Sequence, residues 1–260
     1  MKRTLQQGFL LFLIALLCML QVGASTGGMS WYCVRNKAHK QPVCESNFKF
    51  VEEYDAYFID HAHGDDTEEK VVYLTFDAGY ENGNVAKVLD TLKETGTPAA
   101  FFVLKHLVTA NGDLVRRMVD EGHLVCNHTA HHPNLACASS EKIRAELEEL
   151  NTAYRELIGG DMPRFFRPPE GCFSREMLCA VRDLGYKTIF WSFAYADWDN
   201  QKQPSPERAL QCVRENVHNG AVILLHPTSA TNAGILPAVI GGLKAEGYRF
   251  GTLTELCGVC

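Results

Sequence analysis

The amino-acid sequence predicts an α/β fold with a parallel sheet, closed into a barrel. The chain of 260 residues is 46% hydrophobic and 22% charged, which is typical of a folded globular protein. From residue 71 onward, short apolar runs alternate with amphipathic stretches of helical period. Polar residues follow these runs at their C-terminal ends, the end at which parallel barrels carry their chemistry.

Seven apolar runs are expected to form the sheet. They span residues 71–76, 99–104, 123–127, 164–167, 187–192, 221–226 and 248–253. Helical patterns lie between them, for example at 84–95, 112–121, 139–158 and 206–217. The third is the strongest, because Ser139 or Ser140 can cap it and apolar residues recur on one face. Parallel neighbours need crossovers of this length, so the alternation predicts a parallel sheet.

An open doubly wound sheet and a closed barrel both fit this alternation. Five polar residues from five different runs stand at or just past the C-terminal ends: Asp77, His128, Arg167, Ser192 and His226. A ring of strand ends can gather five such residues, whereas an open sheet offers a single crevice. The positions of these residues therefore favour the barrel.

The N-terminal region differs from the rest of the chain. Lys2 and Arg3 precede an apolar run at 9–20, and small residues follow at 22–24. This pattern predicts a secretory signal peptide over residues 1–24, with an uncleaved membrane anchor as the alternative. We therefore expect an exported protein, secreted or anchored to the outer face of the membrane. Residues 25–69 show no period and are expected to form an irregular lead-in to the main domain.

The charge of the chain bears on its possible partners. The net charge is −6 and no basic cluster is present, so a nucleic-acid partner is not expected.

Ten cysteines in an exported chain indicate disulfides. Cys33 with Cys44, and Cys257 with Cys260 in the C-terminal tail at 257–260, are the plausible pairs. That CxxC lacks the second CxxC that a four-cysteine zinc site would need.

The segment NHTAHHP at 127–133 places three histidines within five positions. His128 and His132 are four apart, a spacing that puts two imidazoles on one face of a helical turn where both can reach one ion. His131 should face away, because adjacent residues do not share a face. On the residues alone, a metal site and a pair of hydrogen-bonded core histidines remain alternatives.

Four further segments end an apolar run on a polar residue. They are TFDAG at 75–79, RFFRPPEG at 164–171, FWSFAYADWDN at 190–200 and LLHPT at 224–228. Asp77 could be a helix cap, Trp198 a core residue beside the solvated Asp197, and His226 a core histidine. The prolines after Arg167 would stiffen its turn and hold the guanidinium in place.

In this order, the five segments resemble the signature of the polysaccharide deacetylases with the NodB-homology domain, carbohydrate esterase family 4. The resemblance covers roughly residues 70–256. The matching segments are Thr75-Phe76-Asp77, His128-Thr129-Ala130-His131-His132, Arg167-Pro168-Pro169-Glu170-Gly171, Asp197-Trp198 and Leu224-Leu225-His226. The fold that this resemblance implies is a distorted (β/α)7 barrel of the NodB-homology type, in agreement with the seven runs.

Two positions depart from the family signature. Its second aspartate, a metal ligand, is Ala78 here, and the first aspartate of its DxxDW motif is Ala194. TFDAGYENG and WSFAYADW look most like the delta-lactam-biosynthetic deacetylases, which act on muramic acid in spore peptidoglycan and lack the same second aspartate. Within that subgroup, the loss does not indicate an inactive enzyme.

The resemblance implies a metal-assisted hydrolysis. His128 and His132 would hold a divalent cation, with Zn²⁺ as the expected ion. Asp77 would be the general base, kept ionised by the neighbouring charge of Arg167.

The same resemblance implies a general acid and a sugar-binding surface. His226 would protonate the leaving amine, and Asp197 would orient its ring. Trp198, Phe166 and Pro168 would bind the substrate, with the aromatic rings offering apolar faces to a sugar.

The expected function is removal of N-acetyl groups from N-acetylmuramic acid in peptidoglycan glycan strands, leading to muramic delta-lactam in the spore cortex. A deacetylase of N-acetylglucosamine polymers and a non-catalytic glycan-binding relative are the alternatives. Glu170 bears on this choice, because a groove-facing carboxylate would repel the lactyl carboxylate of muramic acid.

Overall fold

The computed structural model describes residues 27–259. The segment predicted as a signal peptide or anchor, residues 1–24, lies outside the described residues, as does Cys260. Among residues 27–259, no helix combines the length and the apolar character needed to cross a membrane.

The strands of the main sheet coincide with the seven predicted runs. They are β3 (Lys70–Ala78), β4 (Ala100–Val103), β5 (Leu124–Asn127), β6 (Phe165–Phe166), β8 (Lys187–Ile189), β9 (Ala221–Leu225) and β10 (Tyr248–Phe250). The short β2 (Ala56–Tyr57) joins beside β8, and every pairing in this sheet is parallel. A separate antiparallel pair joins β1 (Met29–Ser30) to β7 (Cys172–Phe173).

The sheet curls into a ring. β3 pairs with β4 on one edge and with β9 on the other, and beyond β4 the order continues through β5, β6 and β8. Beyond β8, Phe193 forms an isolated parallel bridge with Ile223 of β9, which closes the ring of strands. Ser192, which the sequence places among the strand-end polar residues, belongs to this closure, since its Oγ accepts a hydrogen bond from the Val222 amide at 3.0 Å. The predicted α/β class with a curled parallel sheet is confirmed.

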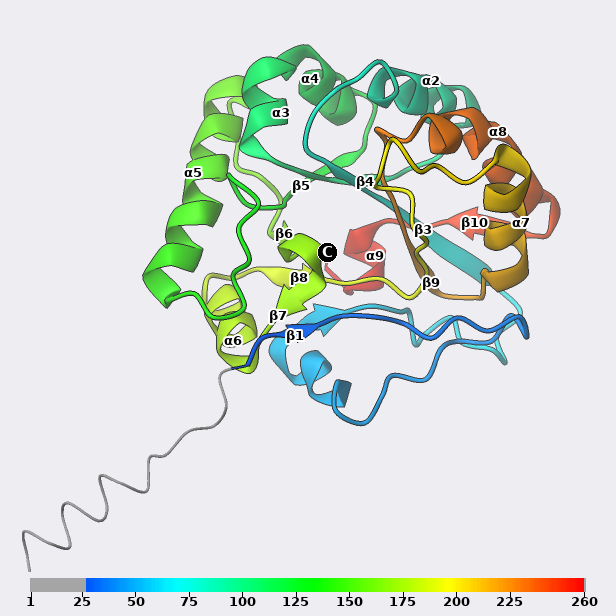
Figure 1. The fold of residues 1–260 in the computed structure, drawn as a ribbon, viewed down its shortest axis with the longest axis horizontal. Helices are drawn as coiled ribbons and strands as arrows, with labels where there is room; N and C mark the ends of the chain where they lie inside the picture. The colour runs from blue at the N-terminus through cyan, green and yellow to red at the C-terminus, as the bar shows by residue number, and fades with distance from the viewer. Residues whose placement is uncertain (1–26, 260) are drawn as a thin grey trace, which may run out of the picture.

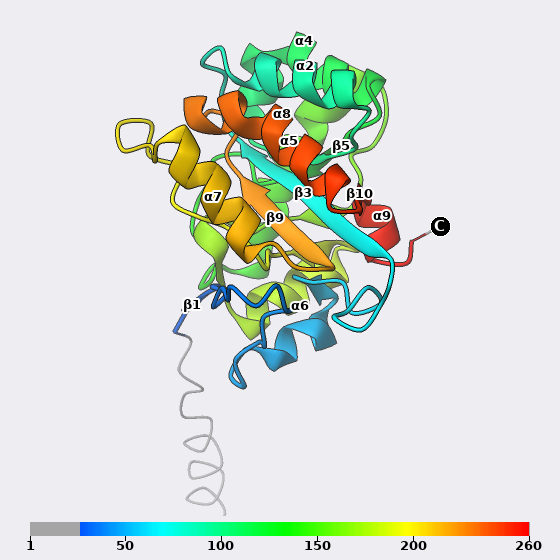
Figure 2. The same ribbon diagram turned by 90° about the vertical axis from the view of Figure 1, so that its right-hand side faces the viewer.

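Helices surround the ring (Figure 1). They are α2 (Val85–Thr95), α3 (Lys105–Ala110), α4 (Gly112–Asp120), α5 (Ser140–Ile158), α6 (Arg175–Asp183), α7 (Pro206–Asn216) and α8 (Ala230–Ala245). Ser139 caps α5, because its side chain accepts from the Lys142 amide at 3.3 Å. Figure 2 shows α7 and α8 lying across β3 and β9. Three short helices complete the described part of the chain: η1 (Lys49–Tyr54), η2 (Pro169–Gly171) and α9 (Leu253–Leu256).

Alternate residues of each strand face opposite sides of the sheet. One set fills the inside of the ring: Val71, Tyr73, Ala100, Phe102, Cys126, Phe165, Ile189 and Val222, joined by Leu253 of α9. The other set packs outward under the helices and includes Val72, Leu74, Phe76 and Ala78 of β3. This alternation determines which side chains reach the mouth of the barrel.

The lead-in, described from residue 27 onward, packs beside α6 rather than standing apart (Figures 1 and 2). Trp31 is buried there, and its ring stacks on that of Phe190, with centroids 4.5 Å apart. Phe48 and Phe173 contact the same aromatic cluster. Cys33 and Cys44, a pair expected to form a disulfide, are free thiols in this structure.

Candidate active site

Strand alternation carries the predicted site residues to one end of the barrel. Inside the ring, Tyr73 is followed two and four residues later by Thr75 and Asp77. In the same way, Cys126 precedes His128, and Phe165 precedes Arg167. Each polar residue therefore continues an inward-facing series beyond the apolar core. The series converge on a cavity of about 650 Å³ lined by Asp77, His128, His132 and His226.

Asp77 and Arg167 form a buried ion pair beneath this cavity. Arg167 is fully buried, and its Nη1 donates to Asp77 Oδ1 at 2.8 Å. Its other nitrogens donate to Ile189 O at 2.9 Å and Thr75 Oγ1 at 2.9 Å. Burial acts to raise the pKa of the Asp77 carboxyl, but the charge of Arg167 and its hydrogen bond to Oδ1 outweigh burial and hold that pKa below its usual value. Asp77 is thus an ionised carboxylate at neutral pH.

His128 and His132 face each other at the mouth, with ring centroids 5.0 Å apart. They stand on a loop, so the expectation of a helical turn is wrong, although the predicted proximity holds. His128 Nδ1 pairs with the Arg167 carbonyl at 2.8 Å, which makes Nδ1 the protonated nitrogen and leaves the lone pair on Nε2. Nε2 lies 3.6 Å from Asp77 Oδ2. Burial lowers the pKa of His128 to about 4, so its ring is neutral.

The histidine loop has two non-glycine residues with positive φ, Thr129 at 74° and His132 at 59°. Hydrogen bonds hold this conformation: Asn127 Oδ1 accepts from the Thr129 amide at 2.9 Å, and Thr129 Oγ1 accepts from the His132 amide at 2.8 Å. Glu146 of α5 is 2% exposed and accepts from the His131 amide at 3.1 Å. His131 itself turns outward, as predicted, toward Glu146.

The sequence analysis did not predict that Glu146 supports the histidine loop. Its position gave one indication that it is buried, because it falls three residues after Ile143 and one before Leu147, on the buried side of α5. Its carboxylate pairs with Lys142 at 2.6 Å.

His226 and Asp197 form a second hydrogen-bonded pair at the mouth of the barrel. Asp197 is 1% exposed, and its Oδ1 lies 2.7 Å from His226 Nδ1, while Oδ2 accepts from the His226 amide at 2.8 Å. Burial acts to lower the pKa of His226, but the hydrogen bond and charge of Asp197 raise it above its ordinary value. The Asp197 contact leaves Nε2 as the nitrogen free for a substrate.

Aromatic residues frame the groove, though not all of those predicted. Trp198 lines the cavity and is 64% exposed, so its ring is open to the groove. Tyr80 lines it too, and its hydroxyl accepts from Asn200 at 2.7 Å. The structure corrects two predictions: Phe166 has no exposed surface, and Pro168 is buried outside the cavity lining. Phe166 precedes the inward-facing Arg167 and so points to the opposite side of the sheet.

The lead-in supports one wall of the groove. The Trp31 amide donates to Gly171 O at 2.8 Å, and its Nε1 donates to Trp191 O at 2.8 Å. Cys33 Sγ donates to the same Trp191 carbonyl at 3.0 Å. Gly171 has φ of +66°, and a Cβ there would lie 2.7 Å from the Trp191 ring, so this wall requires glycine. Gly171 and Trp191 both line the cavity.

Two positions that lack the family's carboxylates lie in different environments. Ala194 lines the cavity, so its small side chain leaves room beside Tyr195. Ala78 is fully buried in the outer core with Phe76 and is absent from the cavity lining. Glu170 is exposed and lines the cavity, which brings a second carboxylate to the groove besides Asp77.

The donor set at the mouth fits a divalent cation of the zinc type, which accepts imidazole nitrogen and carboxylate oxygen. His128 has the tautomer that presents an unprotonated Nε2, and its Nδ1 contact with a backbone carbonyl is the usual support of a metal-binding histidine. Within residues 27–259, no cluster of three or more His, Cys, Asp or Glu side chains has a metal-binding arrangement. His128 and His132 would therefore form an open site with positions left for water and substrate.

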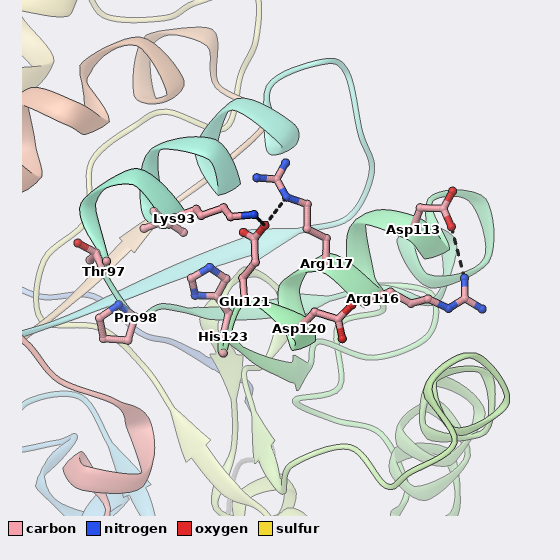
Figure 3. Close-up of a pocket in the computed structure, with 12 residues that line it drawn as sticks. Lys93, Thr97, Pro98, Asp113, Arg116, Arg117, Asp120, Glu121 and His123 are labelled. Carbon is pink, nitrogen blue, oxygen red and sulfur yellow. Dashed lines mark hydrogen bonds and ion pairs between the residues drawn. The ribbon is translucent and has the colours of Figure 1, made fainter.

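A second cavity, of about 710 Å³, lies at the N-terminal ends of β4 and β5, the ends opposite to the candidate site (Figure 3). Glu121 at its centre contacts Arg117 at 2.7 Å and Lys93 at 3.5 Å. His123 is buried beneath them with both ring nitrogens unpaired, and burial lowers its pKa. No nucleophile, base and acid are aligned there, so the smaller cavity at the C-terminal strand ends is the candidate active site.

Comparison with known proteins agrees with this geometry. The family described as Polysaccharide deacetylase matches residues 64–189. Peptidoglycan-N-acetylmuramic acid deacetylase PdaA of Bacillus subtilis is 38% identical over 88% of this chain and 85% of its own length. The structure of Bacillus subtilis PdaA, described as a family 4 carbohydrate esterase, has a TM-score of 0.83 and covers 90% of this chain and 98% of that one, at 36% identity.

Two other relatives extend the range of the family. A peptidoglycan-N-acetylglucosamine deacetylase of Bacillus cereus is 32% identical over 72% of this chain and 88% of its own length. The structure of a family 4 pseudoenzyme from Bacillus anthracis matches with a TM-score of 0.70 and 31% identity, covering 78% of this chain and 69% of that one. From the barrel, the five motifs at its mouth and these similarities, it follows that the chain belongs to the polysaccharide deacetylases, carbohydrate esterase family 4.

Proposed function

We propose that this protein removes the N-acetyl group of N-acetylmuramic acid residues in peptidoglycan, the step that leads to muramic delta-lactam in the spore cortex. The main support for this proposal is that the lead-in forms part of the groove: Trp31 donates hydrogen bonds to the carbonyls of Gly171 and Trp191 in the groove wall. The match to the muramic acid deacetylase spans 229 residues, more than residues 70–256 contain, so it extends into the lead-in. The N-acetylglucosamine deacetylase matches only 72% of the chain.

The proposed chemistry divides between two pairs of residues. His128 and His132 would hold a divalent cation, which would supply Lewis-acid polarisation of the acetamide carbonyl and would activate the attacking water. Asp77 accepts the proton of that water on Oδ2, because Oδ1 is occupied by Arg167. His226 donates a proton from Nε2 to the departing amine. The raised pKa of His226 and the lowered pKa of Asp77 favour these opposite protonation states at neutral pH.

The groove also offers means of holding a glycan. The exposed indole of Trp198 can pack against a sugar ring, and its ring centroid lies 6.5 Å from that of His226. Tyr80 is 44% exposed and offers a second aromatic face. Since peptidoglycan lies outside the cytoplasmic membrane, the proposal includes export, with the N-terminal segment as signal peptide or membrane anchor.

Glu170 favours a second candidate, deacetylation of N-acetylglucosamine residues. It lines the groove, and at neutral pH its carboxylate would repel the free lactyl carboxylate of muramic acid. Among the described residues, the cavity lining includes no Lys or Arg to compensate. N-acetylglucosamine carries no lactyl group and would be unaffected.

Acetate release from defined substrates tests both candidates. Peptide-free glycan strands, which contain both sugars, would be compared with chitin oligomers, and the products would be assigned by mass spectrometry. The proposal expects deacetylated muramic acid, whereas deacetylation of glucosamine alone would favour the second candidate. The Glu170→Gln variant should speed the muramic reaction and leave the chitin reaction unchanged. Binding without acetate release from either glycan would instead indicate a non-catalytic relative.

A further inference from the structure

Asn232 lies behind the His226–Asp197 pair, in the first turn of α8, and is 1% exposed. Its Nδ2 donates to Asp197 Oδ2 at 2.5 Å and to the His226 carbonyl at 3.1 Å. Its Oδ1 accepts from the Tyr195 hydroxyl. The backbone amide of Asn232 donates to Ser229 Oγ at 3.0 Å. Every polar atom of this side chain therefore has a partner inside the protein.

The chemistry of the partners fixes the amide orientation. A carboxylate and a carbonyl oxygen can only accept hydrogen bonds, so the NH₂ group must face Asp197 and the His226 carbonyl. The amide oxygen then faces Tyr195, whose hydroxyl must act as donor. A flipped amide would place oxygen against two acceptors and leave the buried Asp197 with one donor fewer.

Asn232 also limits the rotation of the Asp197 carboxylate. Oδ2 of Asp197 accepts two bonds, from Asn232 Nδ2 and from the His226 amide, while Oδ1 faces the imidazole Nδ1. Donors on both oxygens hold the carboxylate in one plane. Because the His226 imidazole is hydrogen-bonded to this carboxylate, fixing the carboxylate also fixes the direction in which His226 Nε2 points.

We propose that Asn232 is a positioning residue, which locks Asp197 and through it aims His226 Nε2 into the groove, with Tyr195 as the outer support of its amide. The inference rests on the proposed deacetylase function. It assigns a role to Asn232, which lies outside the five family motifs, and to Tyr195, an unspecified position within the DxxDW motif. Tyr195 reaches this network from the cavity lining, so the support begins at the surface of the groove.

The Asn232→Asp variant tests the proposal, because it keeps the shape and replaces the donor by an acceptor of like charge to Asp197. We expect kcat for acetate release to fall about 10- to 100-fold, within the range that general acid catalysis contributes, with KM changed less than about threefold. Tyr195→Phe keeps the ring that lines the groove and removes only the hydroxyl, so a smaller fall in kcat is expected.

The matched control is Thr231→Val, on the same turn of α8. Thr231 Oγ1 donates to the Pro204 carbonyl at 2.9 Å, so this change removes a hydrogen bond of the helix without touching Asp197. Its kcat should equal that of the wild type. An equal fall in the control would assign the effect to loosening of α8 and overturn the proposal.

The far-downfield proton resonance of His226 Nδ1–H provides a readout independent of activity. It should shift or broaden in Asn232→Asp and, more weakly, in Tyr195→Phe, and stay unchanged in Thr231→Val. An unchanged resonance with unchanged kcat, or an effect on KM alone, would refute the positioning role. If the wild type releases no acetate, the proposed function fails, but the resonance comparison still decides the geometry. If Asn232→Asp does not fold, the Tyr195→Phe comparison with Thr231→Val decides it.

Discussion

Replacing Asp197 by asparagine should move the alkaline limit of activity to lower pH. Asp197 Oδ2 accepts hydrogen bonds from the His226 amide and Asn232, so the oxygen of the new amide must face these donors. Its NH₂ group then faces His226 Nδ1, 2.7 Å away from the present oxygen. A donor in that position opposes protonation of Nδ1, and therefore opposes the imidazolium that a general acid requires.

The size of the effect follows from the bond that is lost. A hydrogen bond to a charged group contributes about 1.5–3 kcal/mol. Since one pKa unit corresponds to about 1.4 kcal/mol, the pKa of His226 should fall by about one to two units. As the proposed general acid, His226 would act in its protonated form, so activity should be present below this pKa and lost above it. At a pH above both the new and the wild-type pKa, kcat/KM should be about 10- to 100-fold lower than that of the wild type, and it should approach the wild-type value as the pH decreases.

The assay is the pH profile of kcat/KM for acetate release, with Asp199→Asn as the control. Asp199 lies in the same loop, and its side chain accepts from the Gln201 amide at 2.9 Å, so the control removes the same charge without touching His226. The alkaline limb should move in Asp197→Asn and stay in place in Asp199→Asn. A profile that is reduced equally at every pH, or limbs that move together, would refute the assignment of His226 as general acid.

Three further substitutions test the residues that support the site. Arg167→Met leaves the buried Asp77 carboxylate unpaired, so the free energy of unfolding measured by urea titration should fall by ~3–5 kcal/mol. A decrease of less than about 1 kcal/mol would contradict the buried ion pair. Glu146→Gln removes a charged acceptor from the histidine loop, so Zn²⁺ affinity measured by calorimetry should fall about 10-fold. Equal affinity would show that Glu146 does not support metal binding. Trp31→Ala should lower the free energy of unfolding by ~3–5 kcal/mol and should raise KM, because it loosens the groove wall. An unchanged KM would show that the lead-in does not affect the groove.

Strand alternation made much of the fold predictable. Val71 to Phe76 is apolar on both faces because one face fills the ring and the other lies under helices, and this pattern repeats in each strand. Helix α8 was harder to recognise, because it is apolar on most sides and contains Pro237, so it shows no clear helical period. The lead-in showed no pattern at all, since its aromatic residues pack on elements more than a hundred positions away.

The candidate site, like the fold, could be predicted from the sequence only in part. The strand-end positions of Asp77, Arg167 and His226 follow from alternation, and alternation should also have removed Phe166 from the predicted sugar surface. The spacing of His128 and His132 predicted that they lie close together, but it could not reveal that a loop with positive φ angles brings them together. Asn232 joins Asp197 across 35 positions and has no local signal in the sequence. Contacts of this kind become visible only when the barrel brings distant segments together.

The most direct test of the proposed site is acetate release from peptide-free peptidoglycan strands by the wild type and by Asp77→Asn, each with and without a chelator. Asp77→Asn keeps an oxygen for Arg167 and removes the base. We predict that the wild type releases acetate and that release by the variant is at least about 100-fold slower. Chelator should abolish the wild-type activity, and added divalent cation should restore it. Equal release by both proteins, or no release by the wild type from any of these glycans, would contradict it.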